Sequence, residues 1–300
     1  MSSSDRAHPL TTMLFVPASA AEKLPKIQAL NADAFILDLE DSVAPSQKQI
    51  ARDNARQTVE QFGSRIHLYV RVNSPRSSLI VPDLESVTTH GLAGLSLPKV
   101  EGPDDVLAVD QMLSDLEHDR KLSVGAIRLI VTIETVAGIR NCRAIARSSR
   151  RIRALCFGAG DLRLQLGVAA EKTVTAPNPA LVFGMCELVY ASVEVGLDAP
   201  HDGAYTDIEN RDGVYREALF ARSIGFGGKH AIHPNQLVPI SNAFRTDGAA
   251  LERAERIVEA YDLAVSRGLG AIRFEDELID FPLAEAARAV LDHSRSATDR

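Results

Sequence analysis

Short apolar runs alternate with longer amphipathic stretches from residue 13 to about residue 232 of the chain. Each apolar run is typical of a buried strand, and each stretch that follows has the 3.6-residue spacing of a helix. The predicted strands are 13–16, 34–37, 67–72, 94–97, 129–133, 154–157, a weak 197–199 and 228–232. The predicted helices are 21–30, 47–62, 83–89, 103–118, 136–147, one from Leu162, 179–195 and 211–224.

Eight strand–helix units at a spacing of roughly 30 residues indicate an α/β fold of the TIM (β/α)8 barrel type. A doubly wound open sheet is the alternative, but no GxGxxG follows the first strand. The pattern changes after residue 247. We therefore predict a barrel domain over 1–247 and a C-terminal helical extension over 248–300, which could cap its own barrel or a neighbouring subunit's site.

Composition and charge narrow the range of partners. The 300 residues are 45% hydrophobic and carry a net charge of −7, so we expect no nucleic-acid partner. No apolar stretch approaches the ~20 residues that span a bilayer, and the first residues do not resemble a signal peptide. The three cysteines show no CxxC spacing. These features predict a cytoplasmic protein with reduced thiols and no membrane partner.

Two carboxylates follow neighbouring predicted strands at equivalent places. Glu134 comes directly after the strand 129–133, and Asp161 follows the strand 154–157 through a short glycine-containing link. The carboxyl ends of parallel strands are where ligands and catalytic groups collect. Two carboxylates without clustered Cys or His suit a hard cation such as Mg²⁺. The alternative is that both acids only cap the helices that follow them.

Eight motifs carry a resemblance to a known family. They are LFVPAS (14–19), DAFILDLEDSV (33–43), VRVNSP (70–75), SLPKVE (96–101), VTIETVAGI (131–139), FGAGDLRLQLG (157–167), GFGGKHAIHPNQ (225–236) and ELIDFP (277–282). The sequence resembles the citrate lyase β-subunit-like and malyl-CoA lyase family of the HpcH/HpaI aldolase superfamily. Ala18 and Gly160 depart from residues that are common in that family.

The resemblance implies roles for five residues of the predicted barrel and for one residue of the C-terminal extension. Glu134 and Asp161 match the metal ligands, and Glu134 also borders the substrate. Arg71 matches the arginine that binds substrate and serves catalysis, because a guanidinium can take a carboxylate through two parallel hydrogen bonds. Glu40 and Asp41 are expected to orient Arg71 or metal-bound water.

Asp280 matches the family's catalytic aspartate, which is frequently supplied to the adjacent subunit's site. Its expected role is that of a general acid or base. A helix-capping role for Asp280 is the alternative. The single lysine of the SLPKVE motif, Lys99, could neutralise the acidic mouth of the barrel or simply lie on the surface.

The implied activity is that of a Mg²⁺-dependent lyase, with Mn²⁺ as an alternative ion. It would cleave or form 3-hydroxyacyl-CoA thioesters such as malyl-, citramalyl- or citryl-CoA, with acetyl-CoA and a 2-oxo acid as products. CoA would enter as part of the substrate, and the assembly would be a homotrimer or homohexamer. The alternatives are a citrate lyase β subunit that acts on an acyl-carrier-protein thioester, a class II 2-oxo acid aldolase and a malyl-CoA thioesterase.

Overall fold

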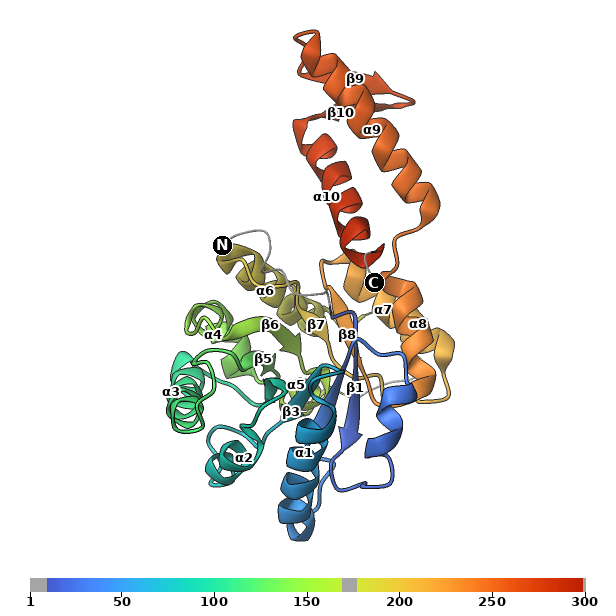
Figure 1. Ribbon diagram of the computed structural model, residues 1–300. Helices are drawn as coiled ribbons and strands as arrows, with labels where there is room; N and C mark the ends of the chain where they lie inside the picture. The colour runs from blue at the N-terminus through green and yellow to red at the C-terminus, as the bar shows by residue number, and fades with distance from the viewer. Residues whose placement is uncertain (1–9, 169–176, 299–300) are drawn as a thin grey trace. The chain divides into compact units, whose positions relative to one another are not determined.

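A closed barrel of eight parallel strands forms the larger part of the protein, as the sequence predicts (Figure 1). The computed structural model describes residues 10–168 and 177–298. Each strand pairs with the next, and β1 pairs with β8 to close the wall. The strands are β1 (Thr12–Pro17), β2 (Ala34–Asp38), β3 (Leu68–Arg71), β4 (Leu92–Leu97), β5 (Arg128–Ile133), β6 (Ile152–Phe157), β7 (His201–Asp202) and β8 (Gly228–Ala231).

Helices follow the strands and form the outer layer of the barrel (Figure 1). The α-helices are α1 (Lys48–Phe62), α2 (Ile80–Val87), α3 (Pro103–Asp119), α4 (Val136–Arg147), α5 (Ala159–Leu166), α6 (Pro179–Val195), α7 (Arg211–Ser223) and α8 (Leu237–Phe244). Three short 3₁₀ helices are η2 (Leu24–Ala29), η3 (Pro45–Gln47) and η4 (Pro234–Gln236). The predicted α-helix over 21–30 is thus a shorter 3₁₀ helix, with Pro25 in its first turn.

The strand residues divide by parity between two apolar clusters. Ile36, Tyr69 and Ile130 belong to a small cluster inside the barrel. Their neighbours Leu37 and Val70 belong to the large cluster between the strands and the helices. Because side chains alternate across a strand, parity predicts which residues at the strand ends face the interior.

The seventh strand lies at His201–Asp202, so the prediction of a strand at 197–199 was wrong. Gly196, with φ of 74°, ends α6, and the amide of Leu197 still bonds to the carbonyl of Ser192 in that helix. The observed strand consists of two polar residues, both buried, and therefore has no apolar signal. Its polarity is accommodated by other polar groups of the barrel.

One of these groups is Lys229 of β8, whose side chain is completely buried. Its ammonium donates to Asp202 of β7, to the carbonyl of Gly203 at 2.7 Å and to Glu217 of α7 at 2.7 Å. A buried charge is tolerated when it is paired and hydrogen-bonded in this way. The cluster therefore connects β7, β8 and α7.

The chain divides into two compact units, and the second begins at Arg245 after the barrel unit has ended at Phe244. The second unit contains α9 (Gly248–Ser266), the antiparallel pair β9 (Ala271–Phe274) and β10 (Glu277–Asp280), and α10 (Phe281–Thr298). It has an apolar core of its own, to which Ile257, Tyr261 and Ile279 belong. In the part of the chain that the structure describes, no helix is long and apolar enough to cross a membrane.

Candidate active site

Acidic and basic side chains gather at the carboxyl ends of β2 to β6. Asp38 and Arg71 are the last residues of β2 and β3 and are direct partners in the register. They share the parity of Ile36 and Tyr69, which point into the barrel. Glu134 has the parity of Ile130 and follows the last residue of β5. The alternation of the strands therefore aims these charged groups at the interior edge of the barrel.

The two predicted metal ligands lie at the starts of consecutive helices. Thr135, not Glu134, caps α4 by accepting a hydrogen bond from the amide of Gly138. Asp161 lies in the first turn of α5, which starts earlier than the predicted Leu162 and shows no side-chain cap bond. Capping therefore does not account for either acid. The first turn still favours the charge of Asp161, because helix N-termini carry partial positive charge.

Gly158, the N-cap residue of α5, lets the two strand ends approach closely. A Cβ atom added there would lie 2.3 Å from Cβ and 2.5 Å from Oε2 of Glu134. Any larger residue would thus displace the Glu134 carboxylate. The absence of a side chain at this position is a requirement for the observed seating of Glu134 beside Asp161.

Glu134 is a buried carboxyl in surroundings that disfavour its charge. Burial, reinforced by the neighbouring charges of Asp161 and Glu40, raises the pKa of Glu134 to about 8. The amide of Lys99 donates to its Oε1 at 2.8 Å. Its Oε2 lies on the side of Gly158, towards α5.

This donor set fits Mg²⁺. A divalent cation would offset the repulsion between the carboxylates of Glu134 and Asp161, and Mg²⁺ is usually held by one or two carboxylates with several waters. Within the described ranges, no three His, Cys, Asp or Glu side chains form a group that could hold a metal. A two-carboxylate site is compatible with that finding.

Lys99 stands between the acids contributed by different strands. Its backbone adopts a left-handed conformation, with φ of 54°, two residues after the end of β4. Its ammonium lies 2.7 Å from Oε1 of Glu40, 3.2 Å from Oδ1 of Asp41 and 3.9 Å from Oδ2 of Asp161. Although burial opposes its charge, the carboxylates of Glu40 and Asp41 raise the pKa of Lys99 above its usual value. Lys99 therefore neutralises the acidic mouth of the barrel.

Arg71 is held chiefly by Asp38. Its Nε and Nη2 donate to the two oxygens of Asp38 at 2.6 and 2.7 Å, and its guanidinium stacks 4.7 Å from the ring centre of Phe15. Nη1 lies 3.3 Å from Oε2 of Glu40. Burial opposes the ionisation of Asp38, but Arg71 outweighs it and keeps the pKa of that carboxyl below its usual value.

Glu40 contacts Arg71, whereas Asp41 lies beside Lys99, and the expectation that both acids orient Arg71 or metal-bound water stays a prediction. Asp41 forms its ion pair with Lys99. Asp38 occupies the two-pronged side of the Arg71 guanidinium. Burial raises the pKa of Glu40 in spite of Arg71 and Lys99.

A layer of buried hydrogen bonds supports the loop that carries Glu40. The ammonium of Lys48 donates to the carbonyls of Leu39 and Glu40, at 2.6 and 2.7 Å, and to Asn73 at 2.9 Å. Asn73 in turn donates to Asp83, which is completely buried. Helices α1 and α2 thereby fix the backbone beside the carboxylates.

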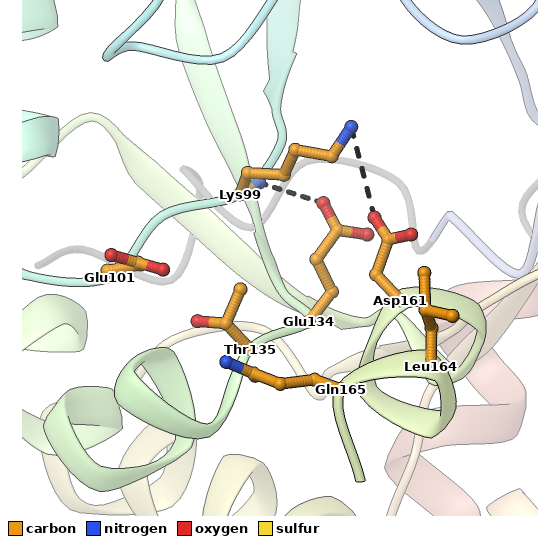
Figure 2. Close-up of a pocket in the computed structure, with 7 residues that line it drawn as sticks. All are labelled: Lys99, Glu101, Glu134, Thr135, Asp161, Leu164 and Gln165. Atoms are coloured by element: carbon orange, nitrogen blue, oxygen red, sulfur yellow. Dashed lines mark hydrogen bonds and ion pairs between the residues drawn. The ribbon is translucent and has the colours of Figure 1, made fainter. Parts of the chain in front are cut away.

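A pocket of about 320 Å³ opens beside this cluster (Figure 2). In Figure 2 the carboxylates of Glu134 and Asp161 lie near each other, and the side chain of Lys99 extends across them. The pocket is lined by Lys99, Glu101, Glu134, Thr135, Asp161, Leu164 and Gln165. It is large enough for a small carboxylic acid.

Asp280 ends β10 in the C-terminal unit. Its Oδ1 accepts a hydrogen bond from the amide of Leu283 at 3.3 Å, in the first turn of α10. Asp280 therefore makes a hydrogen bond of the kind expected for a helix-capping residue. The barrel site and Asp280 belong to different compact units, and the catalytic role of Asp280 remains a prediction.

Sequence analysis missed Asp38, Lys48 and Gly158. Strand parity was the available signal for Asp38, since Ile36 and Asp38 share a face. No local signal marks Lys48, because its acceptors lie on other segments of the chain. The role of Gly158 becomes visible only when β5 and β6 are placed side by side.

Comparisons with known proteins agree with this architecture. Residues 11–234 match the family model described as HpcH/HpaI aldolase/citrate lyase. The chain is 31% identical to the citrate lyase subunit beta of Haemophilus influenzae, covering 95% of this chain and 97% of that one. It is 30% identical to the mitochondrial citramalyl-CoA lyase of Rattus norvegicus, covering 97% and 88%.

Among solved structures, the CitE protein of Mycobacterium tuberculosis in complex with magnesium, acetoacetate and coenzyme A superposes with a TM-score of 0.79. It is 28% identical and covers 97% of this chain and 99% of that one. Sequence, fold and site geometry lead to one assignment. The chain belongs to the HpcH/HpaI aldolase/citrate lyase family, whose members compared above include carbon–carbon lyases.

Proposed function

We propose that the protein is a Mg²⁺-dependent lyase that cleaves 3-hydroxyacyl-CoA thioesters, such as malyl-, citramalyl- or citryl-CoA, to acetyl-CoA and a 2-oxo acid. The observation that carries the proposal is the carboxylate pair Glu134 and Asp161 beside Lys99, which shares Glu40 with Arg71, at the carboxyl edge of a family barrel. The relatives named for citrate and citramalyl-CoA cleavage support this substrate class.

Glu134 and Asp161 would hold Mg²⁺, with Mn²⁺ as a substitute. The bound ion would polarise the oxygen at the reacting carbon and stabilise negative charge that develops there. The amide of Lys99 fixes Oε1 of Glu134 and thereby orients the carboxylate. Gly158 keeps the space beside Oε2 open.

Arg71 would bind the carboxylate of the 2-oxo acid portion. Asp38 occupies Nε and Nη2 and so fixes the plane of the guanidinium, while Nη1 is directed to Glu40. An arginine held in this way loses little side-chain freedom when an anion binds. Glu40 and Asp41 would orient Arg71, Lys99 and bound water rather than ligate the metal.

Asp280 would act as the general base in cleavage. It would take the proton of the 3-hydroxyl while the adjacent carbon–carbon bond breaks and the hydroxyl carbon becomes a carbonyl. The bond's electron pair would pass to the thioester's α-carbon as an enolate, which is then protonated to give acetyl-CoA. We propose that Asp280 reaches the site of a neighbouring subunit in a cytoplasmic homotrimer or homohexamer.

Turnover of the three CoA thioesters by the purified chain tests the proposal. We expect release of a 2-oxo acid and acetyl-CoA with Mg²⁺ and none with a chelator. Glu134→Ala and Asp161→Ala should abolish turnover, whereas Glu60→Ala, which removes an exposed ion pair on α1, should not. Free thiol without a 2-oxo acid would indicate a thioesterase instead.

A citrate lyase β subunit that acts on an acyl-carrier-protein thioester is the second candidate. The similarity to the Haemophilus influenzae subunit over nearly the whole chain favours it. This candidate predicts no turnover of any free CoA thioester and restored turnover when a carrier-bound thioester is supplied. Turnover of free hydroxy acids without CoA would instead favour a class II aldolase.

A further inference from the structure

We propose that the ammonium of Lys99 is a built-in counter-charge that weakens the binding of a divalent cation at Glu134 and Asp161. The inference rests on the proposed function and deepens it, because it names the residue that sets the metal affinity of the carboxylate pair. Without substrate, Lys99 would leave the carboxylate pair only weakly occupied by metal.

The distribution of charge singles out Lys99. Arg71, another cation at this edge, commits two of its donors to Asp38 at 2.6 and 2.7 Å. The ammonium of Lys99 lies 3.9 Å from Oδ2 of Asp161, one of the proposed metal ligands, and bonds to Glu40 at 2.7 Å. Lys99 and a bound cation would therefore share the carboxylate of Asp161.

Lys99 contacts the site in two directions, through its backbone amide and through its ammonium. The left-handed conformation, with φ of 54°, turns the amide to Glu134 while the side chain extends to the acids after β2 and β6. Such a conformation is costly for a residue other than glycine and persists where the surroundings require it. Substitution of the side chain removes the charge and retains the amide bond to Glu134.

The sign of the effect follows from Coulomb's law. Two cations that share one carboxylate repel each other, and the side chain of Lys99 is only about one-third exposed, which limits screening by water. Removal of one unit of positive charge at this range should strengthen cation binding by about tenfold. A role for Lys99 in holding the ligands would have the opposite effect.

Calorimetric titration of the full chain with Mg²⁺, without substrate, tests the inference. Lys99→Met and Lys99→Gln should each lower the Kd for Mg²⁺ by about tenfold, and Lys99→Arg should stay within about twofold of the unsubstituted protein. Lys121→Met is the matched control, because Lys121 has the same left-handed backbone, with φ of 57°, after α3. Glu134→Ala supplies the blank.

An unchanged or higher Kd in both Lys99→Met and Lys99→Gln overturns the inference. If neither the unsubstituted protein nor the Lys99 variants bind Mg²⁺, the proposed function fails as well. Mass-spectrometric acetylation rates provide a second readout that requires no variant. Saturating Mg²⁺ should accelerate acetylation of Lys99 relative to Lys121, and an equal ratio with and without Mg²⁺ contradicts the inference.

Discussion

Single residues decide the seating of the carboxylates, and Gly158 does so by having no side chain. Its φ of −96° is negative, so a left-handed backbone is not the reason for a glycine there. The reason is contact, since an added Cβ would meet Glu134 at 2.3 Å. The same helix start contains a second glycine, Gly160, that has nothing within 4 Å of such an atom.

These two glycines form a matched pair for substitution. Gly158→Ala should weaken Mg²⁺ binding at least tenfold and cost about 1–3 kcal/mol of stability, because the new methyl group overpacks against Glu134. Gly160→Ala should leave Mg²⁺ affinity unchanged and stabilise α5 by up to about 1 kcal/mol. Calorimetric titration and thermal unfolding measure both effects. Equal Mg²⁺ affinities in the two variants would refute the steric explanation.

At this scale the sequence was informative about the ends of strands and uninformative about contacts between them. Glu134, Asp161, Arg71 and Glu40 could be placed at strand ends because each follows or ends an apolar run, whereas their expected roles come from the family resemblance. The expectation that Glu40 and Asp41 orient Arg71 or metal-bound water stays a prediction, and adjacency in the chain does not say which carboxylate faces the guanidinium. In the folded barrel, Asp38 is the carboxylate that faces the guanidinium of Arg71.

Whole elements also position the site, most clearly α1 through Lys48. Its ammonium fixes two consecutive carbonyls, of Leu39 and Glu40, at the end of β2. Lys48→Met should lower kcat by about tenfold to a hundredfold with a smaller change in KM, because misplacement of catalytic groups costs rate. Arg56→Met, on the exposed face of α1, is the control. Unchanged kcat in a folded Lys48→Met variant would show that the loop keeps its position without this lysine.

The strands β6, β7 and β8 place Cys156, His201 and His230 inside the barrel. Nδ1 of His201 lies 3.4 Å from Nε2 of His230, whose Nδ1 lies 3.5 Å from the Cys156 sulfur. Burial lowers the pKa of His201 to about 4, and burial with the adjacent His201 lowers the pKa of His230 as well. Both imidazoles are therefore neutral in the folded protein near neutral pH.

This arrangement predicts loss of stability in acid. Between about pH 6.5 and pH 4 the unfolded chain binds protons at His201 that the folded protein does not, so the contribution of His201 to the free energy of unfolding falls as the pH falls. His201 alone would account for about 3 kcal/mol by pH 4. Urea unfolding at successive pH values measures the slope. The same pH slope in His201→Gln as in the unsubstituted protein would contradict it.

Element-level prediction succeeded where the buried strand is apolar and failed where it is polar. Runs such as Leu129–Ile133 were recognised because hydrophobic residues face both the helices and the interior. The strand His201–Asp202 was missed because its polar side chains are satisfied by His230 and Lys229, which come from a different strand. Hydrophobic pattern alone cannot reveal such pairing.

At the scale of the whole molecule, Asp280 lies in a unit that has its own apolar core. Asparagine caps helices about as well as aspartate does. Asp280→Asn should therefore keep the melting temperature while turnover falls about 10²- to 10⁴-fold. Asp280→Ala should lose the same activity and also about 1 kcal/mol of stability. If Asp280→Asn retains full turnover, Asp280 serves only as a cap.

The short β7 has a consequence for the motions of the barrel. In the described structure β7 forms two residue pairs with β6 and two with β8, fewer than join β2 to β5, so local opening should begin at β7 rather than among β2 to β5. In hydrogen–deuterium exchange, peptides that cover β7 should exchange before those that cover β2 or β5. Asp38 and Arg71 lie at the ends of β2 and β3, and Glu134 follows β5. The barrel wall can therefore open locally at β7 while these charged groups keep their geometry.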